Sequence, residues 1–424
     1  MSIRFGFAET DITPDGPVSL IGFYREDDTS KGVLKPLMAQ AAVWEGEECC
    51  ALIVIDSIGF TVELTNELRD RCADVLKVTR EKVMVCFSHT HAAPDAAAAE
   101  GYFETARDKI IDAVKNAANN METVKLSCGN GKVNIGVNRR TGNDTVDDRI
   151  GILKVSDAGT GKDKLLLLRV TAHGNVLKRD NLLVSPDYFG DVREVLKERY
   201  GCPVMVIQGA AGNIAPKYFC SEETPVDAAG PEFIRSENAL KLMANEICRS
   251  VEVAELSDNS CADIYAYSRE VILSSRLPSM ERAKEIADEA LKYCCIDGSD
   301  WLAEMERLHE QGVEVQKDTV EIQYLSLGAF CLSGVPYEIM TEFALAAEEG
   351  LNDEYFYLNG YTNGILSYFP TKEEYDLGGY EVYWSLLIYY KSFNRVYPFD
   401  REEADRLVRA VTYNVKREEK KNEI

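Results

Sequence analysis

The sequence predicts an α/β fold built on a mixed β-sheet. Short apolar runs rich in β-branched residues, typical of buried strands, alternate with longer segments whose apolar residues recur at helical spacing. No internal repeat, low-complexity stretch or Pro/Ser-rich linker interrupts this alternation, so residues 1–424 are expected to form a single domain. The loops that leave the strand ends of such a sheet are expected to carry the chemistry.

The predicted elements follow one another along the chain. Residues 51–56, Ala-Leu-Ile-Val-Ile-Asp, form the first clear buried strand, and a helix with apolar residues at helical spacing follows at 63–76. A second buried strand, Val-Met-Val-Cys-Phe at 83–87, precedes a turn and a helix at 102–118. The remaining candidates are strands at 165–170, 203–208 and 329–332 and helices at 191–200 and 233–251.

Residues 280–311 differ from the rest of the chain because they read as helical throughout. The helical pattern breaks only near residues 296–300, Ile-Asp-Gly-Ser-Asp, where turn-forming residues gather. This break predicts a helical hairpin inserted between strands.

The charge balance excludes several classes of partner. The 424 residues include 47 Lys or Arg and 71 Asp or Glu, which gives a net charge of −24 and a pI near 4.7. A field of that sign repels phosphate backbones and anionic headgroups, so we expect no nucleic-acid partner. No apolar run approaches the roughly 18 residues that a transmembrane helix needs, so no stable membrane insertion is expected.

Cysteine usage favours a reducing compartment. The twelve cysteines form no CxxC pair, and most lie in apolar contexts, so we expect reduced, buried thiols. Residues 1–6 lack the apolar core and the cleavage site of a secretory signal. Both observations predict a cytoplasmic protein, while the oligomeric state stays open.

Three of the four histidines follow predicted strands. His89 and His91, in the segment Ser-His-Thr-His, come directly after one buried strand, and His173 follows another. A spacing of two along an extended chain puts both imidazoles on one face, and adjacent strands would bring the loops together. The pattern predicts a metal site or an acid–base site, and the alternative is a set of loop histidines that only make hydrogen bonds. His309 lies in the predicted hairpin and is expected at the surface.

Residues 209–213, Gly-Ala-Ala-Gly-Asn, follow the predicted strand at 203–208. Small residues let the backbone approach a ligand or a neighbouring segment closely, so a tight backbone crossing and a ligand site are both compatible with the segment. It is no phosphate loop, because the Gly-Lys-Ser/Thr ending is missing.

Taken in order, the motifs resemble the catalytic domain of the neutral, non-lysosomal ceramidases. The resemblance starts with Ala-Glu-Thr-Asp-Ile-Thr-Pro at 8–14 and Ile-Gly-Phe-Tyr at 21–24, and Ser-His-Thr-His-Ala-Ala-Pro-Asp at 88–95 is similar to the family's histidine motif. Further matches, in family order, are Asn-Arg-Arg at 138–140, Ala-His at 172–173, Gln-Gly-Ala-Ala-Gly-Asn-Ile-Ala-Pro at 208–216, and Tyr-Phe-Pro-Thr-Lys-Glu-Glu-Tyr at 368–375 with Tyr-Glu at 380–381.

This resemblance covers nearly the whole chain except the predicted hairpin. It implies a mixed-sheet ceramidase-like catalytic domain that spans residues 1–424, with the hairpin at 280–311 as an insertion. It also implies a zinc-dependent hydrolase of an amide bond in an N-acylated compound. Ceramide and a soluble N-acylated small molecule both stay open as the substrate, because the acidic chain shows no membrane anchor. The alternative is a catalytically silent relative that has lost the metal and binds a small molecule in the inherited cleft.

The resemblance implies a set of metal ligands. In the family, two histidines, a glutamate and a tyrosine hold zinc, and His89, His173 and Tyr368 are similar to the histidines and the tyrosine. Zinc lowers the pKa of a bound water to about 7 and so supplies hydroxide at neutral pH. Two ligands of one ion are expected to bring their imidazole nitrogens within about 4 Å of one another.

The glutamate is where the chain departs from the family pattern. The family's Pro-Gly-Glu motif corresponds to Ser-Gly-Val at 333–335, so a valine, Val335, is expected in the place of the ligand. Glu338, three residues on, is the nearest carboxylate that could replace it. A replacement from another register would weaken metal binding, although three protein ligands and a water are a normal catalytic zinc set.

Other residues are implied to act on the substrate. His91 resembles a histidine that contacts the substrate near the reacting carbonyl. Tyr380 resembles a tyrosine that hydrogen-bonds to this histidine, and Arg139 resembles an arginine beside the site. Asn213 and Ala215 fall in a substrate-binding segment. Ala215 stands where the ceramidase motif Gly-Asp-Val-Ser-Pro has its serine, so no serine-assisted mechanism is expected.

Two carboxylates are candidates for orienting the histidines. Asp56 ends a buried strand, and Asp187 lies in a loop downstream of His173. Because carboxylates often accept the second ring N–H of a metal-binding histidine, at least one of the two is expected to hydrogen-bond to His89, His91 or His173.

Overall fold

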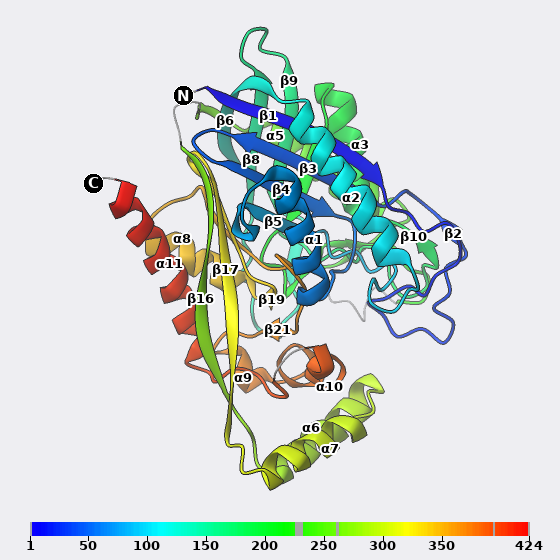
Figure 1. Cartoon of the computed structure of the whole chain (residues 1–424). Coiled ribbons are helices and arrows are strands. Elements are labelled where there is room, and N and C mark those ends of the chain that lie inside the picture. The colour runs from blue at the N-terminus through cyan, green and yellow to red at the C-terminus, as the bar shows by residue number, and fades with distance from the viewer. Residues whose placement is uncertain (1, 225–231, 260–262, 393–394, 423–424) are drawn as a thin grey trace.

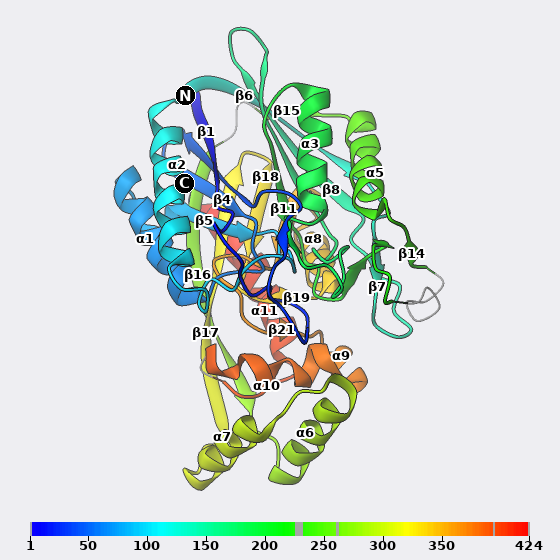
Figure 2. The ribbon, with the colours of Figure 1, turned by 90° about the vertical axis from the view of Figure 1, so that its right-hand side faces the viewer.

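Four layers of secondary structure stack in the order helices, sheet, sheet, helices (Figures 1 and 2). The computed structural model describes residues 2–224, 232–259, 263–392 and 395–422. Two sheets of nine and four strands form the central layers, and their facing side chains form one apolar cluster that includes Trp44, Leu52, Leu167 and Leu325. The mixed α/β class expected from the sequence is confirmed.

The nine-stranded sheet has the strand order β11-β9-β8-β6-β1-β3-β4-β5, and β15 pairs with β6. Only the pairs β4–β5 and β9–β11 among these strands are parallel. The bounds are β1 Ile3–Asp11, β3 Met38–Glu45, β4 Cys49–Ile55, β5 Val83–Phe87, β6 Glu122–Lys132, β8 Arg149–Asp157, β9 Asp163–Val170, β11 Val204–Gln208 and β15 Ser257–Asp258.

This sheet is covered on both faces, which explains the continuous apolar runs in its strands. Along β4, Ile53 and Ile55 face a helical layer, whereas Leu52 and Val54 face the second sheet. The helices on the outer face are α1 (Val62–Leu76), α2 (Tyr102–Asn119), α3 (Tyr188–Tyr200) and α5 (Ala239–Val253).

The sheet curls until its edge strands β11 and β5 approach each other. The Gln208 side chain at the end of β11 donates from Nε2 to the Ser88 carbonyl just beyond β5, at 3.4 Å. Gln40 of β3 likewise donates to the Val204 carbonyl of β11, at 2.9 Å. The curl brings together the loops that follow β5 and β9, although these strands are far apart in the sheet order.

The four-stranded sheet has the order β16-β17-β18-β20 and packs against helices on its far side. Its strands are β16 Ile264–Arg276, β17 Val315–Leu327, β18 Phe330–Gly334 and β20 Phe356–Asn359. The covering helices are α8 (Thr341–Leu351) and α11 (Glu403–Asn422), which bury Phe343 and Leu407 respectively.

The strands β16 and β17 extend beyond the rest of the molecule as a long antiparallel arm (Figure 1). At its end lie α6 (Met280–Cys294) and α7 (Ser299–Glu310), in the segment for which the sequence predicts a helical hairpin. The hairpin packs through Trp301, whose indole N–H donates to the Val396 carbonyl at 2.7 Å, and through Leu387 of α10 (Leu386–Tyr389).

Two short strand pairs outside the large sheets carry residues of the site. β12 (Ile214–Pro216) pairs with β7 (Gly136–Asn138), and β19 (Glu338–Ile339) pairs in parallel with β21 (Tyr368–Phe369). The helix α9 (Glu374–Leu377) and a π-helical turn, η2 (Tyr380–Trp384), follow β21. The other short elements are β2 Gly32–Val33, β10 Leu183–Val184, β13 Tyr218–Phe219, β14 Ile234–Arg235, η1 Arg80–Lys82 and η3 Tyr390–Ser392.

One helix is shorter than the sequence predicts. The helix predicted at 233–251 begins only at Ala239, because Ile234 and Arg235 pair with β13 as strand β14. Every cysteine in the described ranges is a free thiol. No helix among the described residues is long and apolar enough to span a membrane.

Candidate metal centre

Two loops carry the three histidines and cross each other closely. His89 and His91 lie just after β5, and His173 lies just after β9. The His91 N–H donates to the Gly174 carbonyl at 3.1 Å. A Cβ atom on Gly174 would stand 2.6 Å from the His89 carbonyl oxygen, so the crossing requires glycine at this position.

The crossing packs the three imidazoles against one another inside the protein. The ring centroids are 4.6 Å apart for His89 and His173, and 5.0 Å apart for the two pairs that include His91. One nitrogen of each ring lies within 4.8 Å of the others, and all three side chains are buried. Such a group can hold a metal ion, and the predicted convergence of the three histidines is present.

The backbone geometry behind this convergence differs from the expectation. His89 has φ of +59°, so the chain from His89 to His91 is not extended and the alternation of side chains along a strand does not apply. Glycine also shapes the other side of His91, since a Cβ on Gly22 would stand 2.6 Å from His91 Cγ. Burial and the neighbouring positive groups hold the pKa of His91 well below its ordinary value.

Backbone carbonyls fix the tautomers of two histidines. His89 Nδ1 donates to the Ile58 carbonyl at 2.6 Å, and His173 Nδ1 donates to the Ala211 carbonyl at 3.2 Å. Because a carbonyl only accepts, each Nδ1 carries the proton, and each neutral ring presents its Nε2 lone pair. Burial also holds the pKa of His173 well below its ordinary value, which keeps that ring neutral. His173 Nε2 has no hydrogen-bond partner in the described part of the chain.

The Glu338 carboxylate faces these two nitrogens. Its Oε2 lies 3.2 Å from His89 Nε2 and 3.8 Å from His173 Nε2, and the Tyr361 hydroxyl is 3.5 Å away. Glu338 is buried, with 3% exposure, so water does not compensate its charge. Two imidazole lone pairs and a carboxylate oxygen that point at one another form a donor set that can hold a metal ion.

The expectation that Val335 takes the place of the carboxylate is wrong. Val335 is fully buried in an apolar cluster with Tyr337 and Ile339. The residues Pro336, Tyr337 and Glu338 repeat the proline and glutamate of the family motif at the same spacing, with tyrosine in the place of glycine. The proline at 336, rather than the glycine at 334, was the signal in the sequence that locates the motif.

Tyr368 is brought beside Glu338 by a strand pair. In the parallel pair β19–β21, Glu338 and Tyr368 are direct partners. The Tyr368 hydroxyl accepts a hydrogen bond from Arg139 Nη2 at 3.1 Å, and Arg139 also donates to the Gly212 carbonyl at 2.7 Å. Burial and the Glu338 charge hold the pKa of Tyr368 well above its ordinary value. Arg139 therefore orients the phenol, while Glu381 neutralises the guanidinium at 3.0 Å.

Tyr380, in η2, lies beside two tyrosines and forms no hydrogen bond to His91, the predicted partner. Its ring centroid lies 5.8 Å from that of Tyr368. Its hydroxyl hydrogen-bonds to Tyr389, where a hydrogen bond to His91 was expected, and burial holds its pKa well above the ordinary value. In the described structure, His91 Nε2 has no hydrogen-bond partner.

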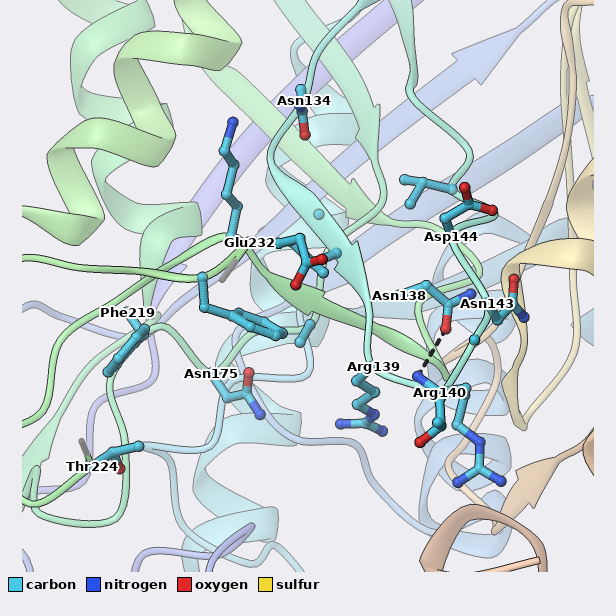
Figure 3. A pocket seen from close by; sticks show the side chains of 18 of the residues that line it. Asn134, Asn138, Arg139, Arg140, Asn143, Asp144, Asn175, Phe219, Thr224 and Glu232 are labelled. Carbon is cyan, nitrogen blue, oxygen red and sulfur yellow. Dashed lines mark hydrogen bonds between the residues drawn. The ribbon is translucent and has the colours of Figure 1, made fainter. Parts of the chain in front are cut away.

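Asn213 and Ala215, which were both predicted to bind substrate, have different surroundings. The Asn213 amide donates to Glu342 at 2.9 Å and accepts from the Thr341 N–H at 2.9 Å, so it anchors the start of α8. Ala215 instead lines a cavity of about 1300 Å³ whose wall also includes Arg139 and Asn175. Figure 3 shows this cavity with the side chains that line it.

Neither predicted carboxylate contacts a histidine. Asp56 forms an ion pair with Arg193, with oxygen–nitrogen distances of 2.9 and 2.5 Å. Asp187 accepts backbone N–H bonds at 2.9–3.1 Å from Val176 and Leu177, in the loop after His173, and from Tyr188 at the start of α3. The carbonyls of Ile58 and Ala211 take the orienting role that was expected of these two carboxylates.

Known structures share this fold. The crystal structure of neutral ceramidase from Pseudomonas aeruginosa superposes with a TM-score of 0.66 at 19% sequence identity, over 90% of this chain and 70% of that one. A ceramidase complexed with C2 superposes with a TM-score of 0.65 at 19% identity, over 90% and 71% of the two chains. No family model matches the sequence, and no curated protein matches it either. The fold is therefore that of the ceramidases, as the resemblance of the motifs implies.

Proposed function

We propose that this protein is a zinc-dependent hydrolase of an amide bond in a small N-acylated compound. The observation that carries the proposal is the meeting of His89 Nε2, His173 Nε2 and the Glu338 carboxylate inside the protein. Buried lone pairs and a buried negative charge that face one another are stabilised by a cation. The ceramidase fold is consistent with the same chemistry.

The residues that would hold zinc are His89, His173, Glu338 and Tyr368. A zinc ion supplies Lewis acidity and a hydroxide nucleophile at neutral pH when it is bound to such a set. Tyr368 is the one ligand that must lose a proton to act as an anion. Arg139 assists that loss, because its guanidinium donates to the Tyr368 oxygen and stabilises the phenolate.

His91 is the group that remains available for proton transfer. It adjoins the two candidate ligand histidines, and its Nε2 is without a hydrogen-bond partner among the described residues. A neutral imidazole at this position hydrogen-bonds the substrate carbonyl oxygen or holds a proton during transfer. Ala215 contributes no hydroxyl, so water rather than serine is the proposed nucleophile.

Metal analysis of protein purified without chelator tests the proposal. We expect about one zinc per chain in the wild type and loss of zinc in His173→Ala, because that change removes an anchored nitrogen ligand. The matched control is His309→Ala, since His309 is exposed in α7. A screen of N-acyl compounds with added zinc then tests the hydrolysis. Absence of zinc in the wild type, with no uptake on zinc addition, would refute the metal-dependent function.

A further inference from the structure

The cavity lined by Asn175 and Arg139 has in its wall a cation with which no described side chain forms an ion pair. Lys178 lines its wall, and its ammonium lies over the Phe219 ring, with the centroid 6.0 Å from Nζ. No ion pair or hydrogen bond of the Lys178 ammonium occurs within residues 2–224, 232–259, 263–392 and 395–415. In a protein with a net charge of −24, an unpaired lysine in a cavity wall is a local exception to the overall field.

The same wall holds three other cations, Arg139, Arg140 and Lys217, and the two arginines are paired. Arg140 forms ion pairs with both Glu374 and Glu381, and Arg139 forms one with Glu381. The two arginines therefore leave little free positive charge for a ligand. Lys178 and Lys217 form no ion pair among the described residues; the Lys217 ammonium lies over the Tyr218 ring, 5.7 Å from its centroid, and the Lys178 charge acts on His91.

The position of Lys178 couples it to the histidine cluster. Its charge lowers the pKa of His91, and it interacts electrostatically with Arg139 and with Asp187. The Asp187 carboxylate accepts hydrogen bonds from the backbone N–H groups of Val176, Leu177 and Tyr188, and no ion pair joins it to Lys178. Burial lowers the pKa of Lys178 to about 8, which leaves the ammonium mostly protonated at neutral pH.

Asn175 supplies a second, independent feature of the same wall. Its residue is 7% exposed, and in the described structure its Oδ1 has no hydrogen-bond partner. Figure 3 shows the Asn175 side chain between Phe219 and Arg139, directed into the cavity. A buried carbonyl oxygen without a donor favours a ligand that brings an N–H group.

We infer that the substrate is an N-acyl compound with an oxyanion, a carboxylate or a phosphate, close to its amide. The oxyanion binds the Lys178 ammonium, and the amide N–H donates to Asn175 Oδ1. The apolar wall residues Val137, Val146 and Phe219 provide contacts for the acyl chain. This inference rests on the proposed function, because it assumes that the bond to be cleaved is the amide.

Calorimetric titration with three related ligands tests the inference. The ligands are N-octanoylglycine, its uncharged carboxamide N-octanoylglycinamide, and the phosphate monoester of N-octanoylethanolamine. The wild type is expected to bind at least one of the two anions at least about tenfold more tightly than the carboxamide, because charge-assisted hydrogen bonds exceed neutral ones. The anion that binds more tightly identifies the natural group. Equal or weaker binding of both anions would overturn the inference without any substitution.

Substitutions of Lys178 test whether this residue causes the preference for anionic ligands. Lys178→Met should abolish the preference for the anion while leaving the affinity for the carboxamide within about twofold, and Lys178→Arg should retain the preference. The control is Lys125→Met, an exposed lysine of β6, which should behave as the wild type. A full preference for the anion in a folded Lys178→Met protein would overturn the assignment to Lys178.

Binding and hydrolysis separate the two proposals. If the anionic ligands bind with the expected preference but remain uncleaved in the presence of zinc, the subsite is correct and the amide hydrolase proposal fails. If the carboxamide is cleaved with zinc and the anions are neither bound nor cleaved more readily, the hydrolase proposal holds and the oxyanion inference fails.

Discussion

Glu338→Gln removes one negative charge from the centre of the candidate metal site and keeps the shape of the side chain. In the wild type, the carboxylate faces two Nε2 lone pairs at 3.2 and 3.8 Å. A neutral amide is a much poorer zinc ligand than a carboxylate. Loss of residues that merely orient ligands costs about 10–100-fold in metal affinity, so we expect the loss of this direct ligand to cost about 100-fold.

The expected effect on stability follows from ligand linkage. With zinc at about 1,000 times the wild-type dissociation constant, bound metal stabilises the fold by about 4.1 kcal/mol, and a 100-fold weaker site gives about 1.4 kcal/mol. The difference is about 2.7 kcal/mol. For 424 residues the unfolding entropy is about 0.9 kcal/mol per kelvin, so the zinc-induced rise in Tm should shrink by about 3 °C.

The assay is a thermal melt of the wild type and of Glu338→Gln, each with zinc and with chelator. In chelator, the variant should melt at or slightly above the wild-type temperature, because a buried charge without a counterion is removed. Glu310→Gln is the control, since Glu310 is exposed at the end of α7. An undiminished zinc response in Glu338→Gln would refute the reasoning, because it would show that the carboxylate does not bind the metal.

Three further predictions concern the surroundings of the site. Val335→Glu should destabilise the protein by about 3–5 kcal/mol in denaturant titrations, because it buries an unpaired carboxylate in an apolar cluster, and zinc should not restore the loss. Gly22→Ala should lower both stability and any hydrolytic activity, since its φ is +104° and the new Cβ would meet the His91 ring; unchanged kinetics would contradict this. The preference for anionic ligands, measured by calorimetry between pH 6.5 and 9.5, should fall as pH rises through about 8. Protonated Lys178 predominates only below its pKa, which burial and Arg139 lower and Asp187 raises.

The sequence predicts best those strands that are buried on both faces. Residues 51–56, 83–87, 165–170 and 203–208 are continuous apolar runs, and each corresponds to a strand of the nine-stranded sheet. The sequence pattern does not predict the strands β6 and β16. Polar and charged residues interrupt both, since β6 carries glycines and an asparagine and β16 forms part of the exposed arm.

The sequence predicts only those features of the site that depend on residues close to one another in the chain. The convergence of His89, His91 and His173 follows from strand-end loops, but the curl of the sheet that joins these loops has no signature in any one segment. The position of Glu338 depends on β19, a strand of two residues, whose pattern is too short to reveal periodicity. The partner of Asp56 is Arg193, 137 residues away, and nothing near Asp56 indicates that ion pair.

The order in which the chain is synthesised gives the pairing of β19 with β21 a further significance. His89 and His173 belong to the first half of the chain, whereas Glu338 and Tyr368 come together only when β21 has been made and has paired with β19. A nascent chain on the ribosome therefore lacks the assembled set of side chains until residue 368 has emerged. Under the proposed function, the complete set of zinc ligands therefore forms only after β21 has paired with β19.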